Sequence, residues 1–135
     1  MEFDEFGVLN IIATEAGGSI PVENVLIRVR GAVEENRQFD KSYLTDLDGV
    51  VKNIKLPTPR RLYSLSPNPA EIPYGTYNVE IRGSGYYPKQ VYDVAVFSGV
   101  ETTLPINMIP KPLNGKDDIF PLGNLDTTVK ENENL

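Results

Sequence analysis

The chain has 135 residues, no cysteine, no histidine and a net charge of −6. This length suits one domain with a hydrophobic core. Disulfides, thiol nucleophiles and cysteine metal ligands are excluded, and the commonest general base and zinc ligand is missing. The acidic balance disfavours contact with nucleic-acid phosphates and anionic membrane surfaces.

The amino terminus, Met1 to Phe6, is acidic and lacks the basic and apolar regions of a Sec signal peptide. No apolar run approaches the roughly 18 residues that a membrane span needs. We therefore expect cytoplasmic synthesis and no membrane insertion. Use in the cytoplasm, transport by another route to the cell envelope, a spore or a particle, and membership of a longer chain all stay open.

Alternating polar and apolar residues predict seven short strands, at residues 6–14, 25–30, 38–45, 50–56, 76–82, 87–97 and 100–108. Turn signals separate them, as at Asp46 to Gly49, where aspartate bonds nearby N–H groups and glycine takes the left-handed conformation. Short strands with a turn about every ten residues predict an all-β fold, a Greek-key β-sandwich.

The strands differ in which faces they bury. In residues 76–82, Tyr77 alternates with polar neighbours and is expected in the core. Residues 6–14 carry apolar side chains on both faces, which is typical of a strand covered on both sides or by a partner. Pro105 lies inside the last strand, so that strand is expected at an edge or with a bulge.

Residues 57–73 contain five prolines among apolar side chains. This density excludes a helix or a central strand, and the apolar residues are unlike a free linker. We expect an ordered, proline-rich insertion on the sandwich surface. Long excursions of this kind are usually functional or disordered, so it is the best candidate for a specific contact.

Six residues are the candidate contacts to a partner protein or glycan: Arg60, Arg61, Tyr63, Tyr74, Tyr87 and Tyr92. Tyrosine rings stack on sugars and anchor interfaces, so two or three exposed together would mark a binding face. The two arginines are suited to grip a carboxylate or phosphate, although exposed loop arginines usually contribute nothing. Tyr77 and Tyr86 are expected in core or corner positions instead.

The periodicity stops after Pro110. We expect a sandwich over residues 1–110 and a disordered or extended tail over residues 111–135, with docking of the tail on a partner left open.

Five motifs occur in order: Gly7-Val8-Leu9, Ile20-Pro21-Val22-Glu23-Asn24-Val25, Thr45-Asp46-Leu47-Asp48-Gly49, Tyr74-Gly75-Thr76-Tyr77-Asn78-Val79 and Gly85-Tyr86. Over residues 6–109 the chain thus resembles the carboxypeptidase regulatory-like domains, whose fold is like that of transthyretin (prealbumin). The resemblance implies a transthyretin-like sandwich.

A second resemblance rests on Ser64-Leu65-Ser66-Pro67, Pro73-Tyr74 and Gly85-Tyr86-Tyr87-Pro88. These segments look like modules of clostridial peptidoglycan-binding and spore-cortex-lytic proteins, in which the module is a non-catalytic accessory. The resemblance implies an association with cell-wall glycan, although this chain shows no recognisable lytic domain.

Two related folds carry out chemistry with residues that this chain lacks. A hydrolase branch uses histidines and a C-terminal Tyr-Arg-Gly-Ser, and the chain has neither. Adhesin repeats join a lysine of the first strand to an asparagine of the last. Residues 7–14 contain no lysine, so Asn107 is expected to be an ordinary exposed asparagine.

The acidic clusters are expected to be structural or solvated rather than metal-binding. Asp46 and Asp48 lack the further oxygen ligands of a calcium loop, so a structural turn is expected. The pairs Glu34-Glu35 and Asp117-Asp118 are expected to be solvated charge. We predict no catalytic residue, no metal and no cofactor.

The leading hypothesis is a non-catalytic binding or scaffolding module that contacts a protein or cell-envelope glycan through residues 57–74. The alternative is a structural subunit of a phage-like or surface particle, with the first strand and the tail covered by neighbouring chains. An enzyme would need paired acids in a pocket. The sequence leaves the partner and the oligomeric state open.

Overall fold

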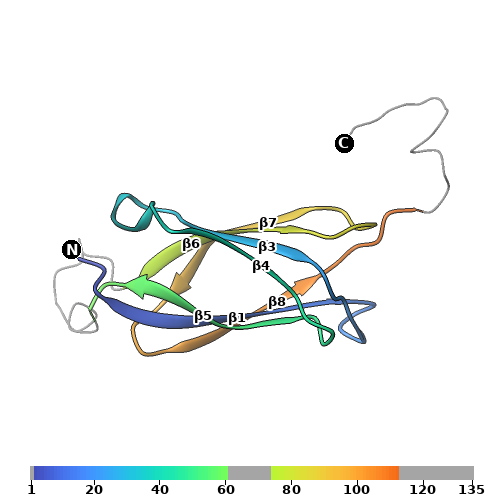
Figure 1. Cartoon of the computed structure of the whole chain (residues 1–135), viewed down its shortest axis with the longest axis horizontal. Helices are drawn as coiled ribbons and strands as arrows, with labels where there is room; N and C mark the ends of the chain where they lie inside the picture. The colour runs from blue at the N-terminus through green and yellow to red at the C-terminus, as the bar shows by residue number, and fades with distance from the viewer. Residues whose placement is uncertain (1, 61–73, 113–135) are drawn as a thin grey trace, which may run out of the picture.

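The computed structural model describes residues 2–60 and 74–112. In this part the chain forms an all-β sandwich of two sheets, which confirms the expected fold class (Figure 1). No helix among these residues could cross a membrane. Residues 113–135 of the expected tail and residues 61–73 of the proline-rich insertion lie outside the described residues.

One sheet is built around β1 (Glu5–Glu15), which pairs with β2 (Ile20–Pro21), β5 (Val50–Thr58) and β8 (Glu101–Asn107). The pairing of β1 with β8 is parallel, and Ile11 lies opposite Leu104. Pro105 is tolerated because β8 is an edge strand, as expected.

The second sheet has the order β4-β3-β6-β7 and is antiparallel throughout. Its strands are β3 (Leu26–Gly31), β4 (Asp40–Leu44), β6 (Gly75–Arg82) and β7 (Lys89–Val96), and the one-turn 3-10 helix η1 (Glu34–Asn36) lies between β3 and β4. The described part therefore has one strand more than the seven expected, the two-residue β2.

The core lies between the sheets and follows the predicted alternation. Tyr77, Val79 and Ile81 of β6 are fully buried, opposite Leu9 and Ile11 of β1 in the same cluster. Tyr86 is half-buried against this cluster, which confirms its expected corner position. Burial of such side chains stabilises the fold by roughly 1.5–3 kcal/mol each.

The insertion begins later than expected. Pro57 and Thr58 still belong to β5, with Pro57 opposite Phe6 of β1, whereas the sequence suggested an end at Leu56. Proline fits there because β5 is an edge strand, so the missing N–H costs no bond to a second neighbour.

Candidate functional site

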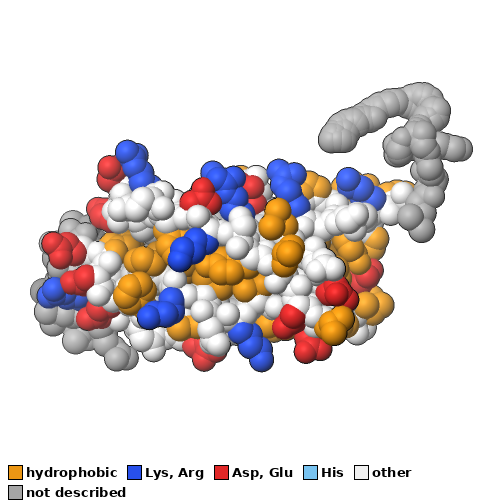
Figure 2. Space-filling model, in the orientation of Figure 1, with side chains coloured by type: hydrophobic (Ala, Val, Ile, Leu, Met, Phe, Trp, Pro, Cys, Tyr) orange, Lys and Arg blue, Asp and Glu red, His pale blue; other side chains and the backbone are white. Residues whose placement is uncertain are grey.

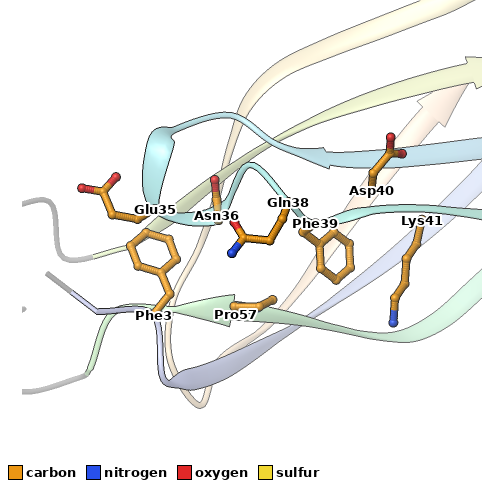
Figure 3. Close-up of a pocket in the computed structure, with 8 residues that line it drawn as sticks. All are labelled: Phe3, Glu35, Asn36, Gln38, Phe39, Asp40, Lys41 and Pro57. Atoms are coloured by element: carbon orange, nitrogen blue, oxygen red, sulfur yellow. The ribbon is translucent and has the colours of Figure 1, made fainter.

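An open hollow of about 280 Å³ lies between the two sheets at one end of the sandwich (Figure 3). Its apolar walls are Phe3, Phe39 and Pro57, and its polar lining comprises Glu35, Asn36, Gln38, Asp40 and Lys41. Figure 3 shows Phe3 and Pro57 below, and the residues of η1, its following loop and β4 above. The hollow is thus assembled from three segments that are distant in the sequence.

Asn36 fixes the upper wall of the hollow. Its side chain accepts a hydrogen bond from the N–H of Val33 (3.1 Å) and donates one to the carbonyl oxygen of Thr76 (3.0 Å). The helix η1 packs closely on the adjoining strand, since a Cβ at Gly31 would lie 1.9 Å from the Asn36 carbonyl oxygen. The wall is therefore tied to β6 and is preorganised.

Tyr77 forms the support behind the hollow. Its ring packs edge-on against Phe39, with centroids 5.7 Å apart, and its hydroxyl donates to the carbonyl oxygen of Pro57. Burial raises the pKa of Tyr77 to about 12. This one side chain links β6 to both walls of the hollow.

Lys41 supplies the positive charge of the site. It pairs in register with the buried Val29, so its side chain starts on the inner face of an edge strand. Its Nζ lies 5.5 Å from the centre of the Phe39 ring. Within residues 2–60 and 74–112 it has no salt bridge.

The base of the insertion lies at the same end as the hollow. Arg60 bonds to Asp4 through Nε (2.8 Å) and a terminal nitrogen (2.7 Å). Where the chain returns, the ring of Tyr74 packs on Phe97, with centroids 5.1 Å apart. Both ends of the insertion are therefore anchored, and Arg61 and Tyr63 lie outside the described residues.

The other two candidate tyrosines are elsewhere. Tyr87 is 46% exposed, follows the turn at the opposite end of β6, and has the Lys111 ammonium 6.0 Å from its ring. Tyr92 is 64% exposed on β7 and its hydroxyl donates to Gln90. Tyr74, Tyr87 and Tyr92 thus occupy three separate places and form no shared face among the described residues.

The remaining candidates have structural explanations. Asp46 accepts hydrogen bonds from the N–H groups of Asp48 (2.9 Å) and Val50 (3.0 Å), which is the expected turn. Asn107 is exposed on β8, as expected. No group of three or more acidic residues in the described part is placed to hold a metal ion.

Two aspartates in ion pairs near the hollow make the stability of the fold depend on pH. Arg60 lowers the pKa of Asp4, and Arg28 lowers that of Asp40. A depressed folded-state pKa gives stability that is present above the unfolded value near 4 and is lost as the pH falls through the folded value.

The chain contains no histidine, so no side chain with an ordinary pKa titrates between pH 5 and 7. We therefore expect the melting temperature to stay level from pH 8 to about 5 and to fall below about pH 4. Circular dichroism melts across this range measure it, and Asp40→Asn should flatten part of the acid limb. A step between pH 5 and 7 would contradict this explanation.

The sequence pointed to the insertion but missed the hollow. Phe39 meets Phe3 and Pro57 in the hollow, but these partners come from remote segments that no spacing rule connects. The one available signal was the Phe39–Lys41 spacing, which places an aromatic ring and an ammonium group on the same face of a strand.

The chain matches no family model and no curated protein sequence. Among solved structures it is similar to the 3-chlorocatechol 1,2-dioxygenase of Rhodococcus opacus 1CP, at 15% identity and a TM-score of 0.53, over 82% of this chain and 63% of that one. It is also similar to the catechol 1,2-dioxygenase of Acinetobacter sp. ADP1, at 13% identity and a TM-score of 0.52, over 93% of this chain and 58% of that one. A third similar structure is the Bacillus anthracis TIE protein, at 16% identity and a TM-score of 0.50, over 79% of this chain and 17% of that one.

This chain therefore spans less than two thirds of each of these three proteins. At identities of 13–16%, these likenesses show a shared fold and carry no activity across. The described residues thus form a β-sandwich of a kind that recurs in larger proteins.

Proposed function

We propose that this chain is a non-catalytic binding or scaffolding module of the carboxypeptidase regulatory-like kind, which contacts a partner protein or a cell-envelope glycan such as peptidoglycan through residues 57–74. The observation that carries the proposal is the anchored base of the insertion. Arg60 is bonded to Asp4, and the ring of Tyr74 packs at a tilt against Phe97, beside a preformed hollow.

An anchored, proline-rich segment suits binding because less conformational freedom is lost on association. Tyr63 adds an aromatic ring inside that segment, and aromatic rings serve both protein interfaces and sugars. A non-catalytic role is favoured because the whole sequence lacks the histidine and cysteine that most often act as bases and nucleophiles.

The test is cosedimentation with purified peptidoglycan, and cross-linking to proteins of the cell that makes the chain. We expect Tyr63→Ala combined with Tyr74→Ala to weaken binding by at least about tenfold, or about 1.4 kcal/mol. Tyr87→Ala combined with Tyr92→Ala is the matched control and should bind normally. If the first pair left every interaction intact, the proposal would be wrong.

A structural subunit of a larger assembly is the second candidate, and the outer face of β1 favours it. Phe6 is 47% exposed there, and the neighbouring Val100 is 41% exposed. Val8 and Ile12 continue the row and are only half-buried. Strictly monomeric behaviour in small-angle scattering at high concentration would count against this role.

A further inference from the structure

The side chains of β1 alternate between the core and the outer face of its sheet, which points away from the second sheet. Those on the outer face include Phe6, Val8 and Ile12. Ile12 pairs with Val50 of β5 and with Pro105 of β8, so the face is apolar across three strands at this level. No described strand or helix covers it, because the other sheet lies on the inner side (Figure 1).

Two opposite charges flank this apolar row. Val8 pairs with Lys55 of β5 on one side and with Glu101 of β8 on the other. Residues directly opposite each other in a sheet point to the same face, so both charged side chains stand on the outer face. Both are exposed, and neither forms a salt bridge within residues 2–60 and 74–112. Figure 2 shows acidic and basic side chains among hydrophobic ones along the lower layer, which holds β1.

Both charges are positioned by neighbours within the sheet. The buried amide of Asn10 donates to Glu101 Oε2 (2.6 Å) and accepts a hydrogen bond from the N–H of Asn53 (2.8 Å). On the other side of β1, the Lys55 ammonium lies 4.7 Å from the centre of the Phe6 ring. Side chains that are ordered in advance lose less conformational freedom when a partner binds.

The distribution of charge selects how two such faces fit together. Sheets that pack face to face keep their strands roughly aligned, so a symmetric pair has its twofold axis either across the strands or along them. An axis across the strands puts β5 over β5 and β8 over β8. β5 contains no acidic residue and β8 no basic one, so Lys55 and Glu101 then find no opposite charge. An axis along β1 puts β5 of one copy over β8 of the other, and Lys55 faces Glu101 twice.

We propose that two copies of this chain associate through the outer faces of their β1 sheets, about a twofold axis parallel to β1. Lys55 of each copy pairs with Glu101 of the other, and Ile12 packs on the same residue of the second copy. Lysine and glutamate side chains together span the roughly 10 Å between packed sheets. The inference deepens the structural-subunit role and rests on it. It is independent of the contact through residues 57–74.

The size of the face sets the strength of the contact. The 11 residues of β1 span about 37 Å, and three strands cover about 14 Å across. The face therefore offers on the order of 500 Å² per copy, close to the lower limit for a specific interface. Lys52, another exposed cation of β5, lies beside the bulge of this edge strand, where a long side chain keeps its ammonium group in water. We expect a weak, closed pair that forms at high concentration.

The test is small-angle scattering of the full chain at low salt, from about 10 μM to about 1 mM. We expect the native chain to change from monomer to dimer in this range, and added salt to weaken the dimer. Lys55→Glu alone and Glu101→Lys alone should each weaken association by at least about tenfold, because each change places two pairs of like charges in the dimer.

Recombining the two changes identifies the axis. Lys55→Glu together with Glu101→Lys on one chain should restore association, and so should an equimolar mixture of the two single variants, because opposite charges meet again in both cases. Arg82→Glu is the matched control. It makes the same change of charge as Lys55→Glu at an exposed position of β6, in the other sheet, and should associate like the native chain. Circular dichroism confirms that each variant is folded.

The outcomes separate this inference from the functions proposed above. A native chain still monomeric at about 1 mM would overturn both the pair and the structural-subunit role, and would leave the 57–74 contact untouched. Association that survives either single charge reversal, that fails to recover in the double variant or the mixture, or that Arg82→Glu weakens equally would overturn the twofold contact alone.

Discussion

Tyr77→Ala should cost about 3–5 kcal/mol of unfolding free energy, as do large-to-small changes at buried aromatic positions. Tyr77 is fully buried, packs edge-on against Phe39 and donates a hydrogen bond to Pro57. Since domains of this size are stable by only about 5–15 kcal/mol, this loss is a large share of the total and should shift the urea midpoint strongly downward. Urea unfolding followed by circular dichroism measures the loss.

Tyr77→Phe is the control for this prediction, because it keeps the ring and removes only the hydroxyl. It leaves the Pro57 carbonyl without that bond, at a cost of about 1–2 kcal/mol. Equal losses in the two variants would show that the hydrogen bond, rather than packing, dominates. A loss below about 1 kcal/mol for Tyr77→Ala would show that Tyr77 does not hold the core and the walls of the hollow together.

Gly31→Ala should be strongly destabilising, because the new methyl group would meet the backbone of η1. The new Cβ would lie 1.9 Å from the Asn36 carbonyl oxygen and 2.5 Å from the oxygen of its side chain. No real Cβ tolerates such contacts, so η1 must move and the hollow must change shape. We expect about 3 kcal/mol of destabilisation in urea unfolding, at the upper end for overpacking.

Gly83→Ala is the matched control, since its nearest contacts are flexible side-chain atoms of Met108 and Tyr86 at 3.2 and 3.3 Å. These neighbours can shift by a few tenths of an ångström. A smaller loss than for Gly31→Ala is therefore expected. If both alanines cost the same, the close packing of η1 would not be the cause.

Local sequence patterns were sufficient for seven of the eight described strands, but not for the two-residue β2. The alternation around Tyr77 predicted its burial, and Pro105 predicted a strand at an edge or with a bulge, because side-chain period and proline chemistry act locally. The end of β5 was placed too early, since Pro57 signals a break only when the strand has neighbours on both sides.

The hollow could not be predicted from the sequence, because it depends on how the two sheets pack together. Phe3, Phe39 and Pro57 meet only because the two sheets close at this end. The same limitation applies to the tyrosines: Tyr74 precedes β6 and Tyr87 comes after its other end, a separation that their number in the sequence does not indicate. Spacing in the sequence gives no distance between strands until the pairing is known.

Site-specific photo-cross-linking tests the proposed contact most directly. A photoreactive amino acid replaces Tyr63, Tyr74 or Tyr92 in turn, and the cells that make the protein are irradiated. We expect adducts with a partner protein or with cell-wall material from positions 63 and 74, and none from position 92 on β7. Equal adducts from position 92, or none from positions 63 and 74, would contradict it.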